Sequence, residues 1–199
     1  MNRLANLVVL FGCCILQITG DPEAFNHTNY FDAIRGCKQY DDVLGYDANV
    51  SYFLTEGLKN VRFTYDTISF KFGILGASDG IIRFGESSLP FEPYHVTEIV
   101  IGTTKCVANR QFRTIAGIGN MNMRLAEELT PNVLSNFQPT MFTLELRGTN
   151  VVLKKFDDST VLLDYSNGAS EPSIRFMGFA KKTADMIYFY DCPWEKQEE

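Results

Sequence analysis

The sequence predicts an all-β domain, an antiparallel β-sandwich or jelly-roll-like fold of about ten short strands. Three observations predict it. Apolar and polar residues alternate with a period of two along most of the chain after residue 50. Clusters of Gly, Asn, Asp and Ser separate the alternating runs. Aromatic residues make up 13% of the 199 residues, with 16 Phe and 9 Tyr against one Trp, which suits half-buried pleated strands.

The clearest alternation covers residues 68–74, which read Ile-Ser-Phe-Lys-Phe-Gly-Ile. A turn signal, Asp79-Gly80, follows. The next apolar run, Ile81–Phe84, is expected to return beside residues 68–74 as the second strand of a hairpin.

Further strands are expected wherever apolar runs lie between turn signals; they cover residues 96–101, 104–109, 141–147, 151–156, 160–164, 174–179 and 186–190. Residues 121–129 contain helix formers that end before Pro131, so they are expected to form either a short helix or a strand.

The first segment indicates the compartment. Residues 1–20 open with Arg3, continue through an apolar stretch and end in Thr19-Gly20, a pattern typical of a signal peptide. A membrane anchor is the alternative, but spanning a bilayer takes about 20 apolar residues and this run is shorter. We therefore expect a secreted, extracellular protein that leaves the membrane after cleavage. Residues 21–50 are expected to form an irregular N-terminal arm, 51–192 the β-domain and 193–199 an acidic tail.

The cysteines fit an oxidising compartment. Cys13 and Cys14 leave with the signal peptide, so three remain. Cys37 precedes the strand-bearing region and Cys192 follows it, so a disulfide between them is expected to tie the ends of the domain together. Cys106 lies within an alternating segment and is expected to be a free, buried thiol.

Two sequons suggest a glycoprotein. Asn26-His27-Thr28 and Asn49-Val50-Ser51 both lack an intervening Pro, and both follow the signal peptide. We expect glycosylation at Asn26, Asn49 or both.

Charge and spacing argue against several functions. The formal net charge of −6 becomes −7 when Arg3 leaves with the signal peptide, which argues against nucleic acid and anionic lipid as partners. The distant His27 and His95 and the scattered cysteines show no metal-ligand spacing. No catalytic, cofactor-binding or metal-binding residue is therefore predicted.

Several motifs support a family resemblance. Residues 97–102 read Thr-Glu-Ile-Val-Ile-Gly, and residues 104–110 continue them; upstream lie Ile68–Phe72 and Asp79–Ile81, and downstream Met177–Phe179. In this order and spacing they resemble the farnesoic acid O-methyltransferase-like domain family, which is common in arthropods. The Trp-containing turn usual after the first motif is missing. The resemblance covers about the last two-thirds of the chain, and the family name implies methyl transfer to the acid precursor of juvenile hormone.

The residues favour a binding function over methyl transfer. An enzyme using S-adenosylmethionine usually needs a strand, a glycine-rich turn and a helix to hold its cofactor. The nearest candidate, Ala-Gly-Ile-Gly-Asn at 116–120, lacks a third glycine and a following acidic residue. We therefore expect a non-catalytic secreted module that binds a small apolar molecule, a glycan or a protein, with the methyltransferase or a hydrolase as the alternative. Candidate surface aromatics are Tyr46, Tyr52, Phe91, Tyr94 and Phe112.

Overall fold

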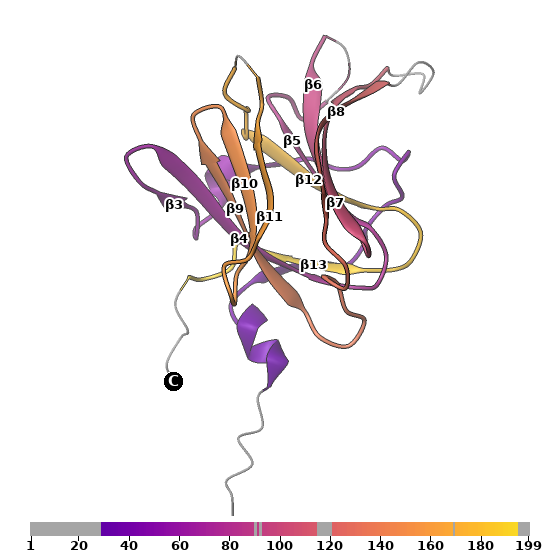
Figure 1. Ribbon diagram of the computed structural model, residues 1–199, viewed down its shortest axis with the longest axis vertical. Helices are drawn as coiled ribbons and strands as arrows, with labels where there is room; N and C mark the ends of the chain where they lie inside the picture. Colours follow the sequence, from indigo (N-terminus) through magenta and orange to yellow (C-terminus); the bar gives the residue numbers. More distant parts are fainter. Residues whose placement is uncertain (1–28, 90, 92, 115–120, 169, 195–199) are drawn as a thin grey trace, which may run out of the picture.

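The computed structural model describes residues 29–89, 91, 93–114, 121–168 and 170–194. They form two antiparallel sheets that face each other across a common core (Figure 1), with two short 3₁₀ helices at Tyr30–Ile34 and Thr55–Gly57. The predicted all-β sandwich is confirmed. No helix in the described ranges is long and apolar enough to cross a membrane.

The first sheet has the strand order β1-β13-β4-β9-β10-β11, with β3 paired to β4. Its strands are β1 (Lys38–Tyr40), β3 (Arg62–Phe63), β4 (Thr67–Leu75), β9 (Thr140–Arg147), β10 (Asn150–Lys155), β11 (Val161–Ser166) and β13 (Ile187–Tyr190). Part of the N-terminal stretch thus belongs to this sheet, because β1 pairs with the last strand of the chain.

The second sheet has the order β2-β12-β5-β6-β7-β8. Its strands are β2 (Phe53–Leu54), β5 (Gly80–Gly85), β6 (His95–Ile101), β7 (Lys105–Phe112), β8 (Met121–Leu129) and β12 (Phe176–Lys181). Residues 121–129, for which helix and strand were both open, form a strand because they pair with β7 along its whole length. Pairing with a neighbouring strand outweighs the helix propensity of this segment.

The expected hairpin between residues 68–74 and 81–84 is wrong. β4 pairs with β9, β13 and β3, whereas β5 pairs with β6 and β12, so the two runs lie in opposite sheets. The Asp79-Gly80 turn instead carries the chain across the sandwich. The Asp79 carboxylate accepts a hydrogen bond from the Thr103 backbone N–H at 3.3 Å and so supports the turn between β6 and β7.

The core lies between the sheets. Phe72 and Phe142 stack with ring centroids 5.3 Å apart, and Phe179 stacks on Tyr188 at 4.4 Å. Cys106 is a free thiol buried in this core, as predicted. The predicted disulfide between Cys37 and Cys192 is also confirmed, with Cα atoms 4.1 Å apart.

The segment from Leu44 to Tyr52 crosses the outer face of the second sheet, the face turned away from the core. The Lys181 backbone N–H donates to the carbonyl of Leu44 at 3.0 Å. Val50 packs with Ile81 and Ala180 in a small apolar cluster that is separate from the main core. The N-terminal stretch therefore supplies side chains to this outer face.

Some expectations fall outside the described residues: the signal peptide at 1–20, Asn26, the glycine-containing run at 116–120 and residues 195–199 of the tail. The second sequon is described, and its Asn49 is exposed.

Candidate functional site

Charged and amide side chains form a straight row across the outer face of the second sheet. In the strand register Arg83 of β5 lies opposite Glu98 of β6, Glu98 opposite Asn109 of β7, and Asn109 opposite Arg124 of β8. We call these four residues the cross-strand row. Because side chains alternate between the two faces of a strand, the neighbours Ile82 and Ile99 enter the core while the row faces outward.

The row is held together by its own hydrogen bonds. Arg83 Nε pairs with Glu98 Oε2 at 2.8 Å, and both side chains are 0% exposed. Asn109 Nδ2 donates to Glu98 Oε1 at 3.3 Å, and Arg124 Nε donates to Asn109 Oδ1 at 3.0 Å. A buried ion pair recovers little more than its desolvation cost, so this one orients side chains more than it adds stability.

Tyr46 covers the row from the crossing segment. Its hydroxyl donates to Glu98 Oε1 at 3.3 Å and accepts from Gln111 Nε2 and Asn122 Nδ2, each at 2.9 Å. Arg83 Nη2 donates to the Tyr46 carbonyl at 2.9 Å, and the guanidinium lies 4.7 Å from the centre of the Tyr46 ring. One tyrosine thus connects four strands of the sheet, β5 to β8, to the N-terminal segment.

A hollow of about 490 Å³ opens over the row. Its apolar lining includes Ile81, Val100 and Val107, and its polar lining adds Asp79, Lys105 and Lys182 to Tyr46, Glu98, Asn109 and Arg124. The charges at the rim are paired: Lys182 with Asp79 at 3.3 Å, and Lys105 and Arg124 both with Glu127. The hollow therefore offers fixed donors and acceptors beside an apolar strip.

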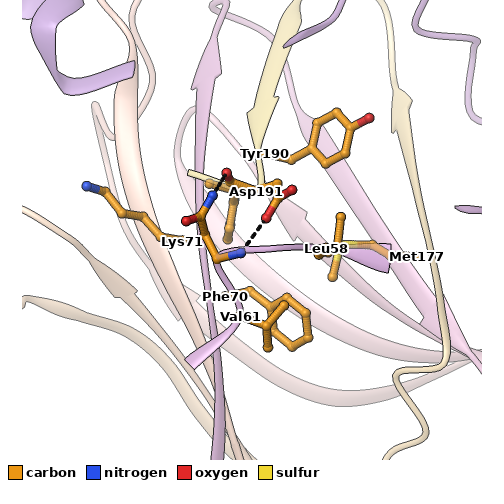
Figure 2. Close-up of a pocket in the computed structure, with 9 residues that line it drawn as sticks. Leu58, Val61, Phe70, Lys71, Met177, Tyr190 and Asp191 are labelled. Atoms are coloured by element: carbon orange, nitrogen blue, oxygen red, sulfur yellow. Dashed lines mark hydrogen bonds between the residues drawn. The ribbon is translucent and has the colours of Figure 1, made fainter. Parts of the chain in front are cut away.

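Another cavity, between the sheets, is too small for a ligand (Figure 2). It holds about 10 Å³, room for about one water molecule. Asp191 lies beside it and accepts hydrogen bonds from the backbone N–H groups of Lys59 and Asn60 at 2.8 and 2.7 Å. Lys38 pairs with the same carboxylate at 2.9 Å. This cluster joins the loop before β3 to the C-terminal end of the domain.

The structure brings three of the five candidate aromatics to the outer face of the second sheet. Tyr46 lines the large hollow, and Tyr52 and Phe91 line a smaller cavity on the same face. Tyr94 lines a different cavity of about 300 Å³, and Phe112 lies against His95 with ring centroids 5.8 Å apart.

The groups considered for catalysis or metal binding do not come together. Cys106 lies in the core, and burial raises the pKa of its thiol. Burial and the nearby Arg110 lower the pKa of His95. Within the described part of the chain no three His, Cys, Asp or Glu residues are placed to hold a metal ion.

Sequence reasoning missed the cross-strand row. A signal was present, because Arg83 interrupts the apolar run Ile81–Phe84 and Glu98 lies in the mainly apolar run Val96–Ile101. A charge inside an apolar strand points either to a buried ion pair or to a site.

Comparison with solved structures finds distant matches. The chain matches, among solved structures, the carbohydrate-binding module CBM66 from Bacillus subtilis at 11% identity, covering 76% of this chain and 94% of the other, with a TM-score of 0.40. It also matches the galectin LEC-6 from Caenorhabditis elegans at 10% identity, with the same coverage and a TM-score of 0.41. LamAcat from Zobellia galactanivorans matches at 12% identity over 65% of this chain and 63% of the other, with a TM-score of 0.37. Similarity at this level carries no information on a ligand.

The sequence comparisons identify the family. No curated protein matches the chain significantly. The profile of the family described as farnesoic acid O-methyl transferase matches residues 46–194, a range that includes Tyr46, the cross-strand row and every strand except β1. The chain therefore belongs to the farnesoic acid O-methyltransferase family.

Proposed function

We propose that this protein is a secreted, non-catalytic module that binds a carbohydrate in the hollow over the cross-strand row. The observation that carries the proposal is the row itself: Arg83, Glu98, Asn109 and Arg124, linked by hydrogen bonds under a hollow of about 490 Å³. Small-molecule sites are usually clefts of about 300 to 1,000 Å³ with a few fixed polar groups, and this hollow has both properties.

The chemistry of the lining favours a ligand rich in hydroxyl groups. A hydroxyl both donates and accepts hydrogen bonds, so it is suited to a surface that alternates carboxylate and amide oxygens with guanidinium and ammonium donors. Lys105, Arg124 and Asp79 supply such groups at the rim. Val100 and Val107 supply an apolar strip for the C–H face of a sugar ring. A wholly apolar ligand would leave the polar groups of the hollow desolvated and unpaired.

The rigidity of the row supports binding. Glu98 is fully buried and bonded to Arg83, Asn109 and Tyr46, so its side chain has no rotamer freedom left to lose when a ligand arrives. Pre-organised groups raise affinity because ordering costs have already been met on folding.

Methyl transfer receives no support from the described residues. The family description implies S-adenosylmethionine, which is usually held where a strand leads through a glycine-rich turn into a helix. The elements of the described ranges are strands and two short 3₁₀ helices, so none of them forms that cradle. Residues 116–120 lie outside those ranges.

A screen of immobilised mono- and oligosaccharides tests the proposal, followed by titration calorimetry with the best neutral sugar. Arg124→Ala should weaken binding of that sugar about tenfold or more, since Arg124 lies in the row and its side chain is half exposed. The matched control is Arg147→Ala, because Arg147 is also exposed and ion-paired, but it lies in the first sheet. Absence of sugar binding at millimolar concentration, or equal affinity in the two variants, would contradict the proposal.

A further inference from the structure

A second cavity, of about 150 Å³, lies on the same outer face just beyond the end of β7, and we call it the Arg113 pocket. Its walls include Val50 and Tyr52 from the crossing segment and Leu89 and Phe91 from the connection between β5 and β6. The exposed lining is mainly apolar, with Arg113 as its one charged group and Asn49 and Ser88 as further polar members, in contrast to the polar hollow over the cross-strand row.

Arg113 is a buried cation without a counter-ion. Only 6% of the surface of Arg113 is exposed. Within the described residues its guanidinium has neither a hydrogen-bond nor an ion-pair partner. Burial lowers the pKa of Arg113, and repulsion from Arg83 lowers it further. The Arg113 nitrogens are not among the fully enclosed polar atoms, so the guanidinium can reach a ligand that enters the pocket. A guanidinium that is largely withdrawn from water and unpaired favours a balancing anion.

The surrounding groups do not supply that anion. Glu98 is already paired with Arg83, so the three buried groups Arg83, Arg113 and Glu98 carry one uncompensated positive charge. Burial raises the pKa of Tyr52, so its phenol stays neutral. The Tyr52 hydroxyl is buried without a well-formed hydrogen bond, and Arg83, whose Nη1 is likewise unsatisfied, lies near enough to act against that rise in the pKa of Tyr52. Buried polar atoms without partners commonly mark the place of a missing ion or water.

We propose that the Arg113 pocket binds a small organic carboxylate, with the carboxylate on the Arg113 guanidinium and its apolar body against Val50, Leu89 and Phe91. A guanidinium pairs with a carboxylate through two parallel hydrogen bonds, and the pair is strongest away from water. The size of the body follows from the volume, because an apolar cavity of about 150 Å³ accommodates a molecule of the size of benzene. This site is separate from the carbohydrate site and does not depend on it.

Benzoate and benzamide are the matched probes, because they have the same shape and differ in charge. The Asn49→Gln protein should be used, since Asn49 lines the pocket and a glycan on it would lie at the entrance. We expect titration calorimetry to show benzoate binding about tenfold or more tighter than benzamide, which is the discrimination expected from one charged, two-point contact. Equal binding of the two probes, or binding of neither, overturns the proposal.

Arg113→Gln should weaken benzoate binding about tenfold, whereas Arg147→Gln, on an exposed arginine of the other sheet, should leave it unchanged. If circular dichroism shows that Arg113→Gln does not fold, the measurement is made on a protein that keeps Arg113. In the ¹⁵N-labelled Asn49→Gln protein, benzoate should shift the Nε–H resonance of Arg113. An unmoved resonance overturns the assignment. Sulfate binding as tightly as benzoate would indicate a simple inorganic anion site and overturn the role of the apolar walls. Loss of sugar binding with benzoate binding intact would refute only the carbohydrate proposal.

Discussion

Glu98 is the residue on which the electrostatics of the outer face depend. It pairs with Arg83, and its charge also stabilises the cationic form of Arg113. All three groups are buried, so removing the carboxylate leaves two guanidinium groups facing each other with little water to screen them.

Glu98→Gln should therefore destabilise the protein by about 3–5 kcal/mol, the cost of breaking a buried pair from one side. Arg83→Met should cost less, because Glu98 can then balance the charge of Arg113. Urea unfolding of both variants gives the two values. If Arg83→Met were the more harmful change, Glu98 would not balance the charge of Arg113.

The burial of Cys106 predicts how its thiol reacts. It lies in the core, 0% exposed, and burial raises the pKa of its thiol, so the reactive thiolate is scarce. We expect thiol reagents at pH 8 to leave the native protein unlabelled and to modify one cysteine after unfolding without reductant. Rapid labelling of native protein would place this thiol at the surface.

At the scale of elements, the alternation in the sequence predicts strands well but not their partners. Residues 68–74 and 141–147 form β4 and β9, because apolar side chains at every second position pack onto the same core. Partners depend on contacts between distant segments, and β4 and β5 were therefore wrongly expected to form a hairpin. The helix propensity of residues 121–129 likewise could not decide between a helix and a strand, because pairing with β7 determines their conformation.

The cross-strand row is invisible in the sequence for the same reason. Its members are 15, 11 and 15 residues apart, intervals set by the lengths of strands and turns. Only the strand register places them in line. Tyr46, by contrast, was singled out as an aromatic in an irregular segment, although its hydrogen bonds to the row could not be foreseen.

Tyr46→Phe tests the link between the crossing segment and the sheet. The change keeps the ring over Arg83 but removes the hydroxyl, leaving the amides of Gln111 and Asn122 without that acceptor. We expect a loss of about 1–3 kcal/mol in the free energy of unfolding, the cost of leaving such polar groups unsatisfied. Tyr40→Phe is the matched control, since Tyr40 packs against the core. Equal effects would mean that the hydroxyl of Tyr46 contributes nothing specific.

At the scale of the whole molecule, the N-terminal sequence pattern predicts how the chain is processed. Expression in a secretory host should yield protein beginning near Asp21, because the apolar segment before it has the form of a cleaved signal. N-terminal sequencing measures this. Enzymatic deglycosylation should lower the mass, with Asn49 accessible because it is exposed. Secreted protein that retains Met1 would contradict the cleavage.

The disulfide between Cys37 and Cys192 closes a loop with a sequence separation of 155 residues, which includes every strand, from β1 to β13, of the two sheets in the described residues. In the chain-entropy account, closing so long a loop restricts the unfolded chain and contributes about 5 kcal/mol, and loss of a native disulfide typically costs about 2–5 kcal/mol. In the native state the bond lies beside β1 and β13, which also pair directly, so its loss should leave the sandwich intact but less stable.

The double variant Cys37→Ala/Cys192→Ala isolates this effect, because neither cysteine is left free to form a wrong pair with Cys106. We expect a β-type circular dichroism spectrum like that of the parent, and a free energy of unfolding lower by about 2–5 kcal/mol in urea. The cooperativity should change as well, since a longer unfolded chain exposes more surface and raises the urea m-value. Cys106→Ala is the control, because it removes a cysteine without opening the loop. A double variant as stable as its parent would show that strand pairing alone holds the two ends of the domain together.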